Sequence, residues 1–313
     1  MYKKIFIFTL LASSLFSACR KTIEFEPENN EDFIILFSEL NPDSTFRAKL
    51  SRAKSIVVYE NQKLINPKVE IYADGQLLEQ LTYNATREIW LGTQKPEINK
   101  EYEVRAYADG LKTVSGTTTI LPPVKYTLLT PTTLTPKAYI EWEMTIKDNG
   151  EEENYFQLNP YLYTKYEEKT ATTTTYSETI SRYLKRVKSE DPVLSHNSTE
   201  KEFLDDSPEN DYLILSDELF NGKTYTLKYS FSLPYHLSQP EKVPGLIKYT
   251  VNTELRHISR ELYLYYKTIN IQDFYYENPF TEPVQIFSNV KNGAGVVGSY
   301  SSYNTSITLF DKK

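Results

Sequence analysis

The tripeptide Ala-Asp-Gly occurs twice, at residues 73–75 and 108–110, and each copy separates two runs in which apolar and polar residues alternate. This pattern predicts two β-hairpins, because Asp-Gly readily adopts the positive φ angles that tight hairpin turns require. Further short runs lie at 33–37, 46–50 and 88–91. Together these runs predict about seven short strands, and that spacing favours an immunoglobulin-like sandwich over residues 33–123.

Tyrosine supports this interpretation in two ways. The chain has 26 Tyr and 15 Phe but only 2 Met, and tyrosine suits a half-buried strand surface. Tyr102, after Ile98-Asn99-Lys100-Glu101, resembles a tyrosine corner, whose hydroxyl bonds to the backbone a few residues upstream. Tyr225, after Asn221-Gly222, is a second candidate corner, so we expect two sandwiches.

Residues 124–313 are expected to form a second β domain. A strand near 155–163 is expected to be broken or kinked at Pro160, since proline lacks the N–H that a strand donates. From 164 to 211 the chain is polar and threonine-rich, and within it residues 177–188 fit either a short helix or part of a long hairpin. Later strands are expected at 284–290 and near 296–300.

The clearest helix signal lies near residues 259–270. Ile258, Leu262, Tyr265 and Ile269 recur at helical spacing, and Ser259 is placed to cap the first turn. The sequence therefore predicts a mainly β chain, with an N-terminal immunoglobulin-like sandwich followed by a second β-sandwich-like domain that carries one late helix.

The first nineteen residues have the anatomy of a secretory signal peptide, with Lys3 and Lys4 followed by an apolar run and small residues. Leu15-Phe16-Ser17-Ala18-Cys19 resembles a bacterial lipobox, which ends at the cysteine that receives lipid. Cys19 is the only cysteine, so the alternative is an ordinary secretion signal with an incidental thiol. Residues 20–32, rich in acidic side chains, are predicted to be a flexible tether.

The net negative charge of the chain argues against anionic partners. The chain has 42 acidic and 35 basic residues, and removal of the leader would take away two lysines and no acid. A body this anionic is a poor ligand for nucleic acid or for a bare anionic membrane, because both would repel it.

Four segments resemble a known family. Residues 33–56 and 66–83, then 100–124, are similar to the front of a Bacteroidota outer-membrane lipoprotein family catalogued as domain of unknown function 4249, and residues 257–301 resemble its closing segment. The resemblance implies an outer-membrane lipoprotein, often encoded beside a TonB-dependent transporter. It implies no catalytic residues.

Three patterns resemble cofactor or metal sites but lack the spacing or context that such sites require. Gly293 to Gly298 fit G-x-G-x-x-G, but a strand-like tail follows in place of a helix, so we expect a hairpin and close packing. His196, His236 and His257 are far apart and lack metal-site spacing. The acidic residues between 205 and 211 lack the spacing of a calcium loop. We therefore expect no cofactor, no metal and no catalytic residue, and a protein that is not an enzyme.

Aromatic side chains are the remaining candidates for binding. A candidate binding surface consists of Tyr263, Tyr266, Phe274, Tyr275, Tyr276 and Phe280. Tyrosine offers large contact area at low entropic cost, although the same rings could fill the core where the helix meets a sheet.

The functional expectation is a lipid-anchored accessory or binding protein of the outer membrane that works with a TonB-dependent transporter. The alternative is an envelope or extracellular hydrolase with an unrecognised carboxylate site. The resemblance to a Bacteroidota family implies that surface export depends on acidic residues soon after the lipidated cysteine. Arg20 and Lys21 come first here and Glu24, Glu26 and Glu28 follow, so we expect the cell surface, with the periplasmic face as the alternative. The ligand is not specified.

Overall fold

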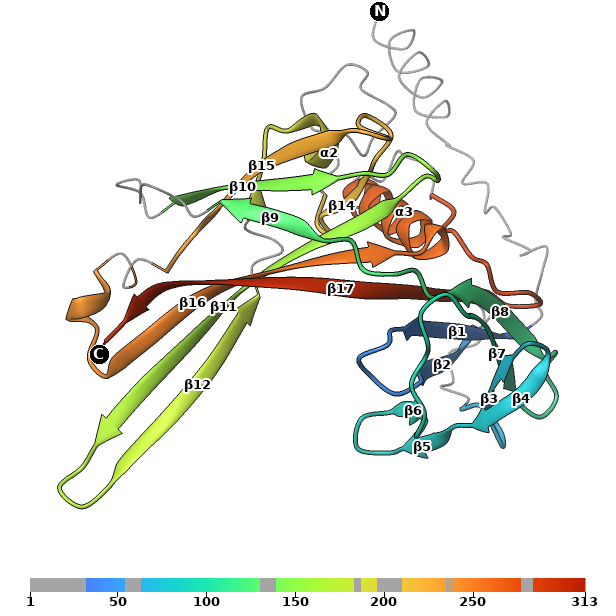
Figure 1. Cartoon of the computed structure of the whole chain (residues 1–313). Helices are drawn as coiled ribbons and strands as arrows, with labels where there is room; N and C mark the ends of the chain where they lie inside the picture. Colours follow the sequence, from blue (N-terminus) through green and yellow to red (C-terminus); the bar gives the residue numbers. More distant parts are fainter. Residues whose placement is uncertain are drawn as a thin grey trace, which may run out of the picture. The chain divides into compact units, whose positions relative to one another are not determined.

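The computed structural model describes residues 32–53, 63–129, 139–182, 187–195, 210–234, 237, 239–276 and 284–312. The described residues from Phe33 onward belong to one compact unit. They form three β-sheets and one long helix, α3 (Figure 1). The expected fold class, mainly β with sandwich-like packing and one late helix, is confirmed.

The first sandwich has eight strands from the N-terminal part of the chain. They are β1 (Phe33–Leu40), β2 (Arg47–Ala53), β3 (Lys68–Ala73), β4 (Gln76–Gln80), β5 (Thr82–Asn84), β6 (Ile89–Leu91), β7 (Glu101–Tyr107) and β8 (Val114–Thr119). One layer is the sheet β4-β3-β7-β8. Its inward residues, such as Ile71 and Val104, pack in one core with Ile34 and Leu36 of β1.

The remaining elements build the second sandwich. They are β9 (Tyr126–Leu129), β10 (Tyr139–Lys147), β11 (Tyr155–Lys169), β12 (Thr174–Arg182), β13 (Val187–Lys188), α2 (Pro192–Ser195), β14 (Ile214–Ser216), β15 (Thr224–Ser232), η4 (Pro240–Lys242), β16 (Leu246–Ile258), α3 (Arg260–Tyr276) and β17 (Ala294–Asp311). The sheet β13-β15-β10-β9 lies over a core that also contains Leu158, Val251 and Leu255. Trp142 is fully buried there and stacks on Phe231.

A nine-stranded sheet, ordered β12-β11-β16-β17-β1-β2-β6-β5 with β14 attached to β11, contributes strands to both sandwiches. Its strand β17 pairs in parallel with β1 over Ala294–Ser299 and antiparallel with β16 over Tyr300–Asp311. Val290 and Val297 accordingly join the core of the first sandwich. The first sandwich therefore includes C-terminal residues that the expected range 33–123 did not contain.

The Gly-x-Gly segment opens β17 and allows it to lie close to its neighbours. Gly295 has φ +113°, and a Cβ there would clash with the carbonyl oxygen of Leu36. A Cβ at Gly298 would lie 2.8 Å from the Cβ of Leu262 on α3. The prediction that these glycines permit close packing is confirmed.

Local turn chemistry was predicted in part. Asp74 and Gly75 have φ +52° and +75°, as a tight hairpin turn requires. The Tyr102 hydroxyl accepts a hydrogen bond from the Glu97 N–H at 2.9 Å, which confirms the first tyrosine corner. The second was wrong, because the Tyr225 hydroxyl donates to the Asp191 carboxylate at 2.6 Å instead of bonding to backbone just upstream.

The structure confirms some of the predictions for residues 124–313 and contradicts others. Helix α3 begins after Ser259, whose Oγ accepts from the Leu262 N–H at 3.4 Å, so the predicted cap is confirmed. Of the two alternatives for 177–188, the hairpin is correct for residues 177–182, which belong to β12 and pair with β11. Residues 183–186 lie outside the described residues. Residues 284–290 are not a strand. Strand β11 is not broken at Pro160, because it runs from Tyr155 to Lys169 and pairs with β16 through that residue. On its other side β11 pairs with β14 over 155–157 and with β12 over 161–169, so the proline lies between these two partners.

Candidate functional site

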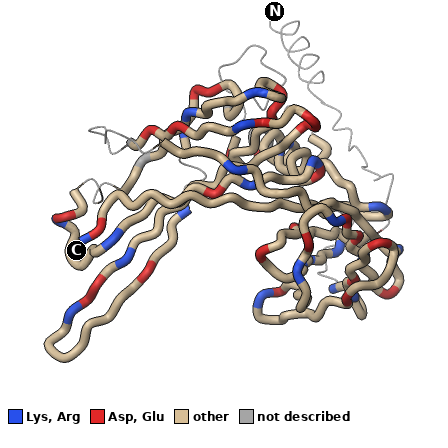
Figure 2. The backbone as a smooth tube through the Cα atoms, viewed as in Figure 1, with Lys and Arg blue, Asp and Glu red and all other residues tan. Residues whose placement is uncertain are grey.

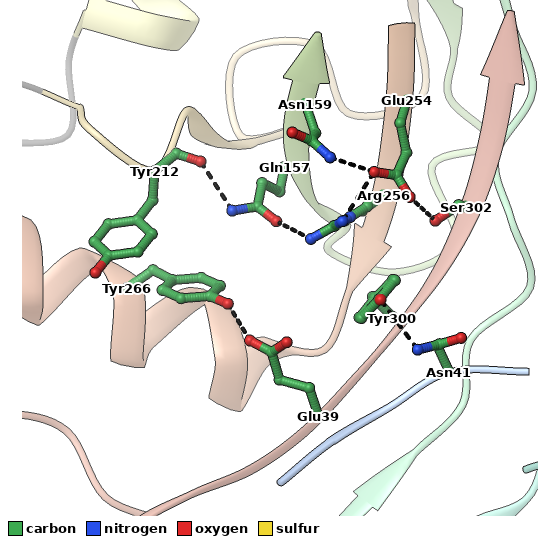
Figure 3. A network of polar contacts seen from close by, with 10 residues as sticks. All are labelled: Glu39, Asn41, Gln157, Asn159, Tyr212, Glu254, Arg256, Tyr266, Tyr300 and Ser302. Atoms are coloured by element: carbon green, nitrogen blue, oxygen red, sulfur yellow. Dashed lines mark hydrogen bonds and ion pairs between the residues drawn. The ribbon is translucent and has the colours of Figure 1, made fainter. Parts of the chain in front are cut away.

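A network of polar side chains lies on the face of the nine-stranded sheet that also carries α3 (Figure 3). Strand pairing explains its assembly, since Arg256 of β16 is opposite Gln157 of β11 and Ser302 of β17. The ten members of the network are Glu39, Asn41, Gln157, Asn159, Tyr212, Glu254, Arg256, Tyr266, Tyr300 and Ser302.

Glu254 is the most heavily hydrogen-bonded carboxylate of this network. Its Oε2 lies 2.9 Å from Nη2 of Arg256 and also accepts from the Asn159 amide, and its Oε1 accepts from Ser302 Oγ at 2.6 Å. Burial by itself raises the pKa of Glu254, but the Arg256 charge and these three donors outweigh burial, so the pKa lies below its ordinary value. The carboxylate is therefore ionised at neutral pH.

Arg256 connects this carboxylate to the rest of the network. Its Nη1 donates to Gln157 Oε1 at 3.1 Å, and its guanidinium lies 4.5 Å from the ring centroid of Tyr300. Gln157 in turn donates to the Tyr212 carbonyl at 3.1 Å. Only 16% of the Arg256 side chain and 14% of the Glu254 side chain are exposed, so the ion pair is largely shielded from water.

Two tyrosines join the network to α3 and β1. The Tyr266 hydroxyl donates to Glu39, and the Tyr266 ring stacks on Tyr212 with 4.5 Å between centroids. The pKa of Tyr266 is raised, first by burial and then by the Glu39 charge. Asn41 donates to the Tyr300 hydroxyl at 3.0 Å. The network thus links residues of β1, β11, β16, β17 and α3.

This arrangement is suited to holding side chains in fixed positions. A carboxylate with a lowered pKa and several donors is a weak proton acceptor at neutral pH, so Glu254 is a poor general acid or base. Among the described residues, no group of three or more His, Cys, Asp or Glu side chains could hold a metal ion.

A second group of carboxylates lines a surface cavity of about 600 Å³ over β10 and β15. Glu143 forms an ion pair with Lys228 at 3.0 Å. Asp191 accepts from the Tyr225 hydroxyl and from the Lys228 N–H. Glu143 and Asp191 therefore have basic or hydrogen-bonding partners within the fold.

The sequence-predicted aromatic surface is only partly described. Tyr263 and Tyr266 are 6% and 8% exposed and belong to the core beneath α3, so their assignment to a free surface was wrong. They point inward because the apolar face of the helix packs on Ile258 and Val296. The side chains of Phe274, Tyr275 and Tyr276, the whole of Phe280, and Cys19 lie outside the described residues.

Sequence reasoning missed Glu39, Glu254 and Arg256. A signal was present in β16, where Lys248, Thr250, Asn252, Glu254 and Arg256 place a polar residue at every second position. That alternation indicates a polar sheet face.

Three comparisons with known proteins complete the description. A family model described as "Domain of unknown function (DUF4249)" matches residues 20–306. The comparison with curated proteins finds no match. Among solved structures, the chain is similar to collagen adhesin (CNA) from S. aureus at 8% identity, with a TM-score of 0.20, over 90% of this chain and 95% of the adhesin chain. A similarity this low carries no argument about fold or function.

Proposed function

We propose that this chain, which belongs to the DUF4249 family, is a lipid-anchored accessory or binding protein of the bacterial outer membrane that works with a TonB-dependent transporter. Cys19, at the end of a signal-like leader, would carry the lipid. No helix among the described residues is both long and apolar enough to cross a membrane.

One observation carries the choice of a binding role over a hydrolase. The buried carboxylate of the polar network, Glu254, is already occupied by Arg256, Asn159 and Ser302. A hydrolytic carboxylate pair needs one member whose proton can be transferred near neutral pH. A carboxylate kept ionised by its neighbours instead holds those side chains in fixed positions within the fold.

Co-purification tests the proposal directly. The full-length protein, extracted from native envelopes in mild detergent, should recover a TonB-dependent transporter identified by mass spectrometry. Cys19→Ala is the matched control, because it leaves the described fold unchanged and should lose the transporter if the lipid anchor places the protein beside it. Equal recovery of the transporter by both proteins would contradict an anchored accessory role. Failure to recover any transporter after chemical crosslinking would contradict the partnership.

The end of α3 is the proposed contact region. Tyr275 and Tyr276 lie in its last turn, where aromatic anchors could provide much of the binding energy. Changing both to Ala should reduce transporter recovery without lowering the melting temperature. A lower melting temperature would instead assign these rings to the core, and normal recovery with normal stability would remove them from the interface.

A further inference from the structure

Strand β12 is a free edge of the nine-stranded sheet. Among the described residues it pairs only with β11, and it is the terminal strand in the sheet order (Figure 1). Every residue from Thr174 to Arg182 is exposed except Ser181, which is half-buried. Tyr176 and Ile180 are 58% and 62% exposed. An edge of this length is a template for another strand unless charge, proline or a bulge blocks it.

The usual protections of such an edge are weak in β12. Its nine residues, TTYSETISR, include no proline and no lysine, and its pairing with β11 continues from Thr174 to Arg182 without a register shift. Glu178 and Arg182 are the only charged residues in the strand, and they have opposite signs. Figure 2 shows charges of both signs along the β11–β12 hairpin.

The hairpin geometry determines which backbone groups point outward. The Thr170 N–H donates to the Thr173 carbonyl at 2.8 Å, so these two residues form the hydrogen-bonded pair that closes the turn. Hydrogen-bonded and non-hydrogen-bonded pairs alternate along an antiparallel ladder. The even-numbered residues from 174 to 182 therefore occupy non-hydrogen-bonded pairs with β11, and their N–H and C=O groups face the open edge.

From this edge we infer that residues 178–182 of β12 pair antiparallel with residues 178–182 of a second copy of the chain, about a two-fold axis at Ile180. This register makes Ile180 opposite Ile180 of the copy, and it makes Glu178 opposite Arg182 of the copy, twice by symmetry. It is the only antiparallel register of two β12 strands that brings these opposite charges face to face. A register centred on Glu178 would instead set two carboxylates against each other, which is unfavourable for directly opposed residues.

Interactions within the hairpin are compatible with this pairing. Glu178 forms an ion pair with Lys165 of β11 at 3.2 Å, and 53% of its side chain remains exposed. Lys165 also lies 5.2 Å from the ring centroid of Tyr176, which is four residues from the axis. The partner is thus a copy of this chain, recognised by backbone hydrogen bonds, one isoleucine pair and two ion pairs.

A charge-exchange experiment tests the inference on the full chain in mild detergent, with mass measured by analytical ultracentrifugation across a concentration series. The unaltered protein should dimerise. Arg182→Glu and Glu178→Arg should each dimerise at least tenfold more weakly, because each places like charges opposite one another. An equimolar mixture of the two variants should recover dimers, since one chain then has glutamate at both positions and the other has arginine at both. Glu168→Arg, on the inner strand of the same hairpin, is the matched control and should dimerise normally.

Cysteine crosslinking tests the register without altering these charges. Ile180→Cys should form an intermolecular disulfide under mild oxidation, because Cα atoms of a hydrogen-bonded antiparallel pair lie within disulfide range. Tyr176→Cys, which is off the axis, should not. A monomeric unaltered protein at every concentration would overturn the inference. The inference would also be overturned if both charge variants dimerised as strongly as the unaltered protein, or if positions 176 and 180 crosslinked equally.

Discussion

The buried ion pair between Glu254 and Arg256 allows a quantitative prediction. Arg256→Met keeps most of the apolar volume of the side chain but removes its charge. The change eliminates the contact with Glu254, the hydrogen bond to Gln157 and the cation–π contact with Tyr300. Breaking a fully buried pair costs about 3–5 kcal/mol, because the remaining charge has no counter-ion. Since both side chains retain slight exposure, we expect about 3 kcal/mol, measured by chemical denaturation.

A double-mutant cycle separates the ion pair from the rest of the change. Glu254→Gln alone should also cost about 3 kcal/mol, since it leaves the Arg256 charge buried without a counter-ion. The double variant should lose only about 1–2 kcal/mol, much less than the sum, because neither charge then remains. Lys248→Met is the control, since its ion pair with Asp311 is exposed and should contribute less than about 1 kcal/mol. Additive losses in the cycle would refute the coupling that the structure indicates.

The pH dependence provides an independent check. In the unaltered protein the pKa of Glu254 lies below 4.5, so its contribution to stability is present above that pH and is lost as pH falls through the folded-state pKa. Without Arg256, burial becomes the main influence and should raise the Glu254 pKa, so protonation would favour the folded variant. The stability difference between Arg256→Met and the unaltered protein should therefore shrink on acidification. A difference that is constant with pH would contradict this reasoning.

Three other outcomes are expected. Cys19→Ala should abolish incorporation of labelled palmitate, and unchanged labelling would contradict lipidation at this cysteine. Asp217 is 1% exposed, and burial raises its pKa above the ordinary value. Because the folded protein holds this proton more tightly than the unfolded chain, Asp217 lowers the stability of the folded state as pH rises. Asp217→Asn should therefore melt at a higher temperature than the unaltered protein at neutral pH, and at the same temperature in acid. The argument would be refuted if the two proteins had equal melting temperatures at neutral pH as well. Gly295→Ala should lower the free energy of unfolding by more than about 4 kcal/mol, because the new Cβ would clash with Leu36. Gly75→Ala, which has open space around it, should lower it by only about 1–2 kcal/mol. Similar losses for the two variants would contradict the packing argument.

Local patterns predicted the local structure well. The Asp74-Gly75 hairpin, the Tyr102 corner and the Ser259 cap each depend on residues close together in the chain, and each was found. The helix alternative was wrong for residues 177–182, because Ile180, Leu184 and Val187 at helical spacing are weak evidence in a segment rich in β-branched threonine.

The polar network could not be derived in the same way. Tyr266 and Glu39 are 227 residues apart, and they meet only because β17 brings β1 beside β16. Sequence alternation identifies a polar face on β16, but it does not identify which residues from distant strands share that face. The same limitation applied to Tyr263 and Tyr266, whose spacing on α3 is compatible with a core or with a surface.

The position of β17 has a consequence for how the chain reaches its native state. The strand that completes the first sandwich, β17, comes long after β1 in the chain, so β1 keeps an unpaired edge until residues 294–299 have been synthesised. Contacts with such large sequence separation form slowly, because the entropic cost of closing the loop precedes any gain from pairing. A chain that lacks residues 294–299 would therefore leave β1 without its parallel partner and the first sandwich incomplete.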